Sequence, residues 1–328
     1  MAGELIAPFP WFGGKRRVAA EVWERFGDVP NYVEPFAGSL AVLLQRPAWH
    51  TGAIETINDI DKYVSNFWRA LSIDPDGVAQ YADWPVNEAD LFARHLWLVN
   101  DGRRQLRENL DYDPNWYDAR IAGWWVWGLC AWIGSGWCSG DGPHTYPEDG
   151  DAGQGVNRQL PHMSNAGQGV NRQLPHMGDA GQGVLPRNGA LLTYMRDLSR
   201  RLQRVRVACG DWSRVVTASV TERHGLTGVF LDPPYGDGNV DYSAGGNHSG
   251  EIAEDVRQWA IANGDNPLLR IALCGYEPLE MPDVWRKHRW KARKGYQVET
   301  TNPAREVVWF SPNCLYAKRT LFDLENVT

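Results

Sequence analysis

Two stretches of the chain, one toward each end, alternate short apolar runs with longer amphipathic runs, and this alternation limits the possible folds more than any other feature. Strands are expected where apolar runs are short and bounded by Gly, Asp or Pro, and helices where apolar residues recur every three or four positions. The expected strands are 32–36, 53–58, 205–209, 228–231, 268–273 and 307–310, and the expected helices are 39–45, 62–71 and 252–261. This order predicts an α/β fold whose sheet is parallel and covered on both faces.

The segment 74–190 has a different composition, and we expect it to form a lobe inserted into a sheet domain made of 1–73 and 191–328. It contains a tryptophan cluster and then a 14-residue tandem repeat, in which AGQGVNRQLPHM occurs at 152–163 and again at 166–177. The simpler interpretation is a duplication in a tolerant surface loop. The alternative is that the repeats present arginines to a polyanion, namely Arg158, Arg172 and Arg187.

Charge and cysteine usage exclude several classes of protein. The formal charge is 33 − 40 = −7, so a protein that coats DNA without specificity is not expected. The five cysteines are scattered without a C-x-x-C pair, which argues against a disulfide framework and a zinc site and fits a reducing compartment. None of the eight histidines has a partner at metal-binding spacing, so no metal is expected. We expect a soluble, cytoplasmic protein without a membrane segment.

The tetrapeptide Asp232-Pro233-Pro234-Tyr235 directly follows an apolar run, which places a carboxylate at the carboxyl edge of the sheet. The prolines remove two N–H donors and leave carbonyl acceptors. Such a loop suits a planar base with an exocyclic amino group, because the carboxylate and a carbonyl accept its two hydrogens while the tyrosine ring stacks on the base. Acceptors on both hydrogens localise the nitrogen lone pair for attack. The alternative is a strand-terminating turn with a packing tyrosine.

A second motif runs from Glu34 to Ser39, and its Gly38 lets the backbone approach a ligand where α/β folds hold nucleosides. Asp59 ends the next expected strand, where a carboxylate can accept both ribose hydroxyls. Together they suggest a cofactor that contains adenosine. Gly13-Gly14-Lys15 is not a P-loop, because Phe9 stands at the first glycine position and Arg16 replaces the Ser or Thr.

Five motifs resemble, in order and spacing, those of Dam-like adenine-specific DNA methyltransferases. They are Trp11-Phe12-Gly13-Gly14-Lys15, Glu34-Pro35-Phe36-Ala37-Gly38-Ser39, Asp59, Gly210-Asp211-Trp212 and Asp232-Pro233-Pro234-Tyr235. The resemblance covers 8–74 and 205–242, with weaker similarity to the chain end. It implies a doubly wound, Rossmann-like methyltransferase sheet, with a DNA target-recognition lobe at the position of 74–190.

The resemblance also implies S-adenosylmethionine as cofactor, DNA as partner and the adenine amino group as methyl acceptor. By this resemblance, Trp11 and Lys15 hold the methionine end of the cofactor, with Lys15 on its carboxylate, and the cofactor loop consists of Glu34, Pro35, Phe36 and Gly38. Asp59 binds the ribose, and Asp211 and Trp212 bind the adenine of the cofactor. The target base is held by Asp232, Pro233, Pro234 and Tyr235. The family has a second glycine where this chain has Leu40, so the cofactor loop is expected to turn differently.

The implied reaction needs no metal and no covalent intermediate, since positioning and desolvation suffice for transfer of an activated methyl group. The amino group is paired in duplex DNA, so the base must flip out of the helix. Trp137 is a candidate wedge or stacking residue, and a loop at 302–306 is a candidate to close over the DNA. The alternatives are methylation of the cytosine amino group, an RNA substrate, and a DNA-binding protein on the same fold without catalysis.

Overall fold

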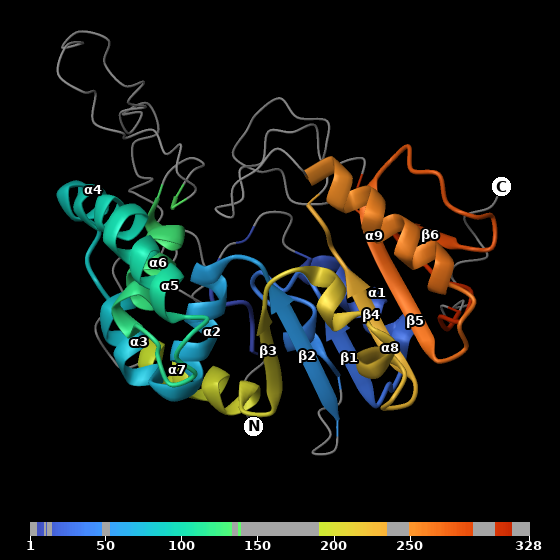
Figure 1. Cartoon of the computed structure of the whole chain (residues 1–328), viewed down its shortest axis with the longest axis horizontal. Helices are drawn as coiled ribbons and strands as arrows, with labels where there is room; N and C mark the ends of the chain where they lie inside the picture. The colour runs from blue at the N-terminus through green and yellow to red at the C-terminus, as the bar shows by residue number, and fades with distance from the viewer. Residues whose placement is uncertain are drawn as a thin grey trace, which may run out of the picture. The chain divides into compact units, whose positions relative to one another are not determined.

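The computed structural model describes residues 5–9, 11, 15–47, 53–132, 137–138, 190–234, 249–290 and 306–316. Within them, a seven-stranded sheet confirms the predicted α/β fold (Figure 1). Its strands are β1 (Asn31–Glu34), β2 (Ile54–Asp59), β3 (Val205–Cys209), β4 (Thr227–Leu231), β5 (Leu269–Tyr276), β6 (Arg286–Arg289) and β7 (Glu306–Phe310). Their order across the sheet is β3-β2-β1-β4-β5-β7-β6. The pairs β1–β2, β1–β4 and β4–β5 are parallel, whereas β7 runs antiparallel to both β5 and β6.

The strand order changes direction at β1, which pairs with β2 on one side and with β4 on the other. In open α/β sheets, ligands bind outside the carboxyl ends of the strands at such a switch point. Glu34 is the last residue of β1, and Asp232 directly follows β4. The topology therefore brings the two expected site motifs to one edge of the sheet.

Helices α1 (Arg16–Phe26) and α9 (Ser249–Asn263) cover opposite faces of the sheet. Side chains alternate between the two faces along a strand. A Cβ placed on Gly228 would lie 2.8 Å from the Phe26 ring of α1, so Gly228 faces α1 and leaves room for its aromatic residue. The neighbouring Val229 packs on the other side with Val256 and Ala260 of α9.

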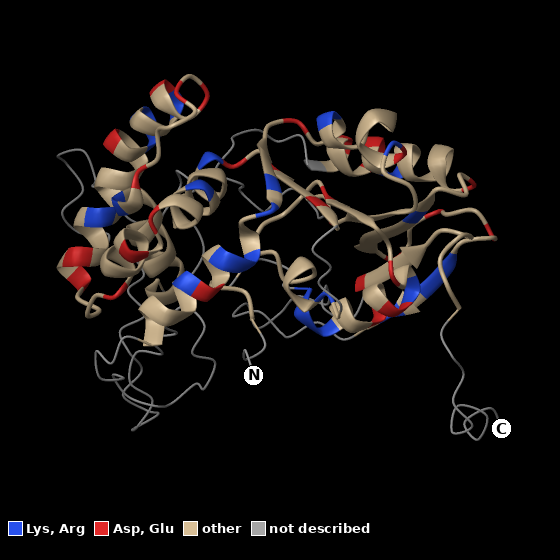
Figure 2. Ribbon diagram, turned by 90° about the horizontal axis from the view of Figure 1, so that it is seen from below, with Lys and Arg blue, Asp and Glu red and all other residues tan. Residues whose placement is uncertain are grey.

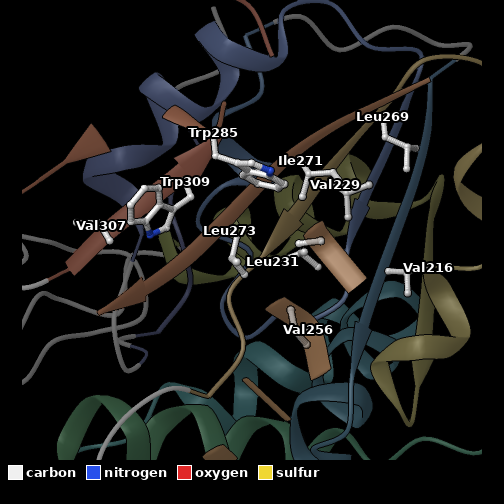
Figure 3. Packing of buried hydrophobic residues seen from close by; sticks show 11 residues of the cluster. Val216, Val229, Leu231, Val256, Leu269, Ile271, Leu273, Trp285, Val307 and Trp309 are labelled. Carbon is white, nitrogen blue, oxygen red and sulfur yellow. The ribbon is translucent and has the colours of Figure 1, made fainter. Parts of the chain in front are cut away.

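The core under α9 is built from alternate residues of three strands and from Trp285 (Figure 3). Its labelled members are Val216, Val229, Leu231, Val256, Leu269, Ile271, Leu273, Trp285, Val307 and Trp309. Full burial of a Val, Leu or Ile side chain stabilises a fold by about 1.5–3 kcal/mol. This core fixes the positions of the carboxyl ends of β4 and β5 and of the start of β7.

The chain forms two compact units, one containing β1, β2 and β4 to β7 with α1, α8 (Ala218–Thr221) and α9, and the other a helical unit. The helices of the second unit are α2 (Lys62–Ile73), α3 (Pro75–Ala82), α4 (Glu88–Trp97), α5 (Arg103–Asn109), α6 (Ala119–Ala131) and α7 (Ala190–Leu202), with a π-helical turn at Leu98–Gly102. The predicted boundaries at 73/74 and 190/191 stay predictions. Both acidic and basic residues occur in each of the two units (Figure 2).

The helix expected at 39–45 is wrong. The structure has turns there and a short 3-10 helix at Leu43–Gln45. Gly38 and Leu40 adopt positive φ angles of 46° and 59°, which a right-handed helix excludes. The apolar run therefore contributes buried side chains without forming an α-helix.

Candidate active site

Asp232 lies where β4 ends, and Pro233 and Pro234 follow it in extended backbone outside the strand. Leu231 of β4 is paired with Leu273 of β5, so Asp232 comes level with Cys274 and faces the α1 side of the sheet. The carboxylate thus occupies the sheet edge that the sequence predicted. Tyr235 lies outside the described residues.

An ion pair joins Lys15 to this carboxylate. Lys15 precedes the first turn of α1, and its Nζ lies 3.0 Å from Oδ1 of Asp232, with side-chain exposures of 5% and 19%. Burial is the largest single influence on the pKa of Lys15 and lowers it, but Asp232, Cys274 and Glu306 together outweigh burial, so the net pKa is raised. The ion pair holds the Asp232 carboxylate, the acceptor required for an amino group, in place at the sheet edge.

Glu34 is buried on the same side of the sheet, and its Oε2 accepts a hydrogen bond of 3.0 Å from the Tyr32 hydroxyl. Burial raises the pKa of Glu34 well above the usual range of a glutamic acid, and the nearby Asp232 charge adds to this. Cys274 is buried beside Asp232 as well, and burial together with that carboxylate raises the pKa of its thiol. The surroundings of Asp232 are thus acidic or neutral, apart from Lys15.

Glu306, the first residue of β7, lies at this edge of the sheet, whereas the sequence interpretation assigns it only to a loop expected to close over the DNA. It is 5% exposed and is paired in register with Tyr276 of β5. Burial raises the pKa of Glu306 to about 7, with Lys15 lowering it and Asp232 raising it. Its Oε2 is buried without a hydrogen-bond partner. The available signal was a glutamate directly before an apolar run, a pattern too common to single it out.

The expected cofactor loop is held by Asn58 at the end of β2. Asn58 Nδ2 donates to the Pro35 carbonyl at 3.0 Å, and the Ala37 amide donates to the Asn58 carbonyl at 2.9 Å. Leu40, where the family has glycine, adopts a φ of 59°, a conformation that glycine reaches at the least cost. Leucine at this position therefore does not by itself force a different turn, and its side chain is fully buried.

Phe36 and Trp212 form an aromatic pair beside this loop. Their ring centroids are 6.2 Å apart and their planes are inclined by 29°. Asp211 precedes Trp212 and accepts the Ser213 amide at 2.9 Å, which fixes the start of the short 3-10 helix Trp212–Val215. The structure therefore brings Lys15, Glu34, Phe36, Asp211, Trp212 and Asp232 into one compact unit.

Two expected cofactor residues belong to the helical unit. Trp11 packs with Phe9 and Trp125, at ring-centroid distances of 5.7 and 5.9 Å. Asp59 accepts the Asp61 amide through Oδ1 at 2.9 Å, at the start of α2. Their roles toward a cofactor stay predictions.

Trp137 lies in the interior of the helical unit rather than on its surface. It is 8% exposed, its indole donates to the Trp125 carbonyl at 3.0 Å, and its ring lies directly on Gly128. Insertion into DNA would require this side chain to leave its packing. Arg158, Arg172 and Arg187 lie outside the described residues.

Among the described residues there is no group of three or more His, Cys, Asp or Glu side chains placed to hold a metal ion. In the same part of the chain, no helix has the length and apolar character needed to cross a membrane.

Residues 11–110 match the family model of the D12 class of N6 adenine-specific DNA methyltransferases. The matched segment includes Trp11, Lys15, Glu34 and Asp59, and Asp232 lies beyond it. A comparison with curated proteins gave no match.

Proposed function

Because residues 11–110 match the family model of the D12 class N6 adenine-specific DNA methyltransferases, we propose that the sheet edge around Asp232 is the reaction site, with S-adenosylmethionine as methyl donor and a flipped adenine as acceptor. The observation that carries this proposal is the ion pair between Lys15 and Asp232 at the switch point of the sheet. It holds a carboxylate acceptor where open α/β folds bind their ligands.

The amino group of adenine is a poor nucleophile, because its lone pair is delocalised into the ring. In the proposed complex, Asp232 accepts one amino hydrogen and a carbonyl of the Pro233–Pro234 segment accepts the other. Both bonds favour a pyramidal nitrogen whose lone pair is directed at the incoming methyl group. The ion pair with Lys15 holds Asp232 in position, and both bonds strengthen as positive charge develops on the nitrogen.

The residues of the sheet-containing unit fit the proposed cofactor. Bound S-adenosylmethionine supplies a methyl group on a positively charged sulfur, and the carboxyl groups of Glu34, Asp232 and Glu306 make this edge suited to a cation. The Phe36 and Trp212 rings are nearly parallel and offer faces to an adenine ring. Asp211, which directly precedes Trp212, would accept the adenine amino group.

The DNA contacts are proposed for parts of the chain outside the sheet edge. Adenine in a duplex must leave the stack to reach Asp232, so base flipping is part of the proposal. Tyr235 would stack on the flipped base. The repeat arginines Arg158, Arg172 and Arg187 would contact phosphates, which position a protein on DNA without reading sequence.

The test is incubation of the protein with S-adenosylmethionine labelled in its methyl group and unmethylated genomic DNA, followed by digestion to nucleosides and chromatography. Label in N6-methyldeoxyadenosine is expected. Label in N4-methyldeoxycytidine would move the acceptor to cytosine, and label that appears only when RNA is supplied would change the substrate. Absence of label from both nucleic acids would contradict the proposal.

A further inference from the structure

A buried carboxylate oxygen at the sheet edge has no donor. Oε2 of Glu306 is buried without a hydrogen-bond partner, although the residue is 5% exposed. Leaving a buried polar atom unpaired costs about 1–3 kcal/mol, and more if it is charged. Native structures keep few such atoms, and those they keep call for a functional reason.

The strand register places this oxygen beside the proposed reaction site. Cys274 is paired with Val308 and Tyr276 with Glu306, so these four side chains point to one face of the sheet. It is the face of Lys15, because Lys15 and Asp232 both influence the ionisation of Cys274 and of Glu306. Cys274 is level with Asp232. Glu306 pairs with Tyr276, which lies two residues beyond Cys274 along β5.

The cation nearest to this site is already engaged. Lys15 Nζ forms its ion pair with Asp232 at 3.0 Å, and no ion pair joins it to Glu306 among the described residues. Lys15 Nζ also lies 5.9 Å from the ring centre of Trp290, whose indole Nε1 is a second buried atom without a partner. One position beyond the pair Arg289–Val307, Trp290 comes level with Glu306. An unsatisfied acceptor and an unsatisfied donor therefore both lie near one ammonium.

This arrangement matches a zwitterion. We propose that Glu306 binds the α-ammonium group of the amino-acid end of S-adenosylmethionine, while Lys15 and the indole of Trp290 bind its α-carboxylate. The proposal rests on the proposed function, since it assigns one end of the same cofactor. Lys15 has three N–H donors and can hold Asp232 and a second carboxylate together. Charge-assisted hydrogen bonds of this kind are among the stronger ones in proteins.

The ionisation of Glu306 supports this assignment. With a pKa raised to about 7, the carboxyl group is partly protonated near neutral pH in the ligand-free protein. An ammonium ligand favours the carboxylate, so binding lowers this pKa and releases a proton. The titratable groups that face Glu306 are Lys15, Asp232 and Cys274. On the neighbouring β6, His288 is directed to Glu21 of α1, with 3.6 Å between Nδ1 and Oε1.

The test is calorimetric binding of two ligands that share the adenosine part. S-adenosylhomocysteine carries the amino-acid end, and 5′-methylthioadenosine lacks it. Glu306→Gln is expected to weaken the affinity for S-adenosylhomocysteine about 10-fold to 100-fold, the range for a hydrogen bond to a charged group. The affinity for 5′-methylthioadenosine should not change. Glu254→Gln is the matched control, because Glu254 is an exposed carboxylate paired with Arg257 on α9, and it should change neither affinity.

A second measurement does not depend on the variant. For the unaltered protein, affinity for S-adenosylhomocysteine should rise on the order of 10-fold from pH 5.5 to 7.0 as Glu306 ionises, while the α-ammonium stays charged below its usual pKa of about 7.7–8.0. Affinity for 5′-methylthioadenosine should stay flat.

The assignment of Glu306 would be overturned if Glu306→Gln weakened the binding of both ligands equally or of neither. The same pH dependence of affinity for both ligands would also overturn it. If the unaltered protein bound neither ligand, the proposed function itself would fail, a result distinct from these three.

Discussion

The two units of the protein each bury a basic side chain, and they stabilise it in different ways. In the sheet-containing unit, Lys15 is paired with Asp232 and lies near the buried carboxyl group of Glu306. In the helical unit, Arg94 is 8% exposed and its guanidinium lies over the rings of Trp84, Trp124 and Trp127, at 4.9, 5.2 and 4.4 Å. Burial lowers the pKa of Arg94, whereas the carboxylate raises that of Lys15.

The difference teaches what each unit can do with its charge. Aromatic rings attract a cation through their faces but carry no net charge, so they offer no charged group to which a ligand could bind. The cluster around Arg94 therefore fills space and serves packing. Each cluster leaves a buried polar atom without a hydrogen-bond partner, Nη1 of Arg94 and Oε2 of Glu306, but the atom near Lys15 belongs to a carboxyl group that lies close to a second carboxylate. The charged cluster is suited to bind and the aromatic cluster to hold helices together.

Removal of the Lys15 charge should have the largest effect. Lys15→Met keeps an apolar chain of similar length but leaves the partly buried Asp232 carboxylate without its cation. Loss of one partner of a buried pair costs about 3–5 kcal/mol, and methyl transfer should fall at least about 100-fold. Urea unfolding and single-turnover methylation would measure both effects. Lys15→Arg retains the charge and should restore more of the stability than of the activity. If Lys15→Met were as active as the unaltered protein, the role of the ion pair would be refuted.

The aromatic cluster should respond in stability alone. Arg94→Ala removes the contacts with three tryptophan faces and should lower the free energy of unfolding by about 3 kcal/mol, as large-to-small core changes do. Arg94→Met refills the space and should recover about half of that loss. Affinity for S-adenosylmethionine should not change in either variant. A weakened cofactor affinity with unchanged stability would reverse the distinction between the two clusters.

Leu40 tests the backbone of the cofactor loop. Leu40→Ala should cost about 3 kcal/mol, because a fully buried leucine is lost. Glycine normally destabilises relative to alanine, but here the φ of 59° penalises alanine by about 1–2 kcal/mol, so Leu40→Gly should be at least as stable as Leu40→Ala. Thermal unfolding of the pair would decide this. A glycine variant less stable than the alanine variant would show that the positive φ carries no strain.

The smallest expected effect concerns Glu306 and pH. Its pKa is raised in the folded protein from the model-peptide range to about 7, so the native state retains a proton that the unfolded chain has lost. Its contribution to stability is therefore fully present below pH ~4.5 and is lost as pH rises to about 7. Glu306→Gln should raise stability at pH 8 by on the order of 1–2 kcal/mol and leave it unchanged at pH 4.5, as denaturation at both pH values would show. A uniform change at both would contradict this account.

The sequence predicted the sheet and most of the edge residues because both depend on local patterns. Short apolar runs followed by Glu34 and Asp232 identify strand ends, and the sheet topology then brings those ends together. The pairing of Lys15 with Asp232 could not be predicted, since it depends on where α1 packs. The place of Glu306 at the sheet edge could not be predicted either, because it arises from the antiparallel pairing of β7 with β5.

One error came from a pattern with more than one outcome. The apolar run after Gly38 has helical spacing, but the positive φ at Leu40 ends any helix there. Tertiary packing overrides the local pattern at this place. The role of Trp137 toward DNA stays a prediction, and its ring packs on Gly128, where the absence of a Cβ leaves space for it.

The most direct test of the account is Asp232→Asn, which keeps the shape and one acceptor oxygen of the side chain but removes its charge. Methyl transfer to adenine under single-turnover conditions should fall about 100-fold to 1,000-fold, the loss typical of one preorganised electrostatic contact, while affinity for S-adenosylmethionine changes little. Thermal stability should fall as well, because the buried Lys15 loses its ion-pair partner. A variant that methylates adenine at the rate of the unaltered protein would contradict the claim that the ionised carboxylate at the sheet edge activates the amino group.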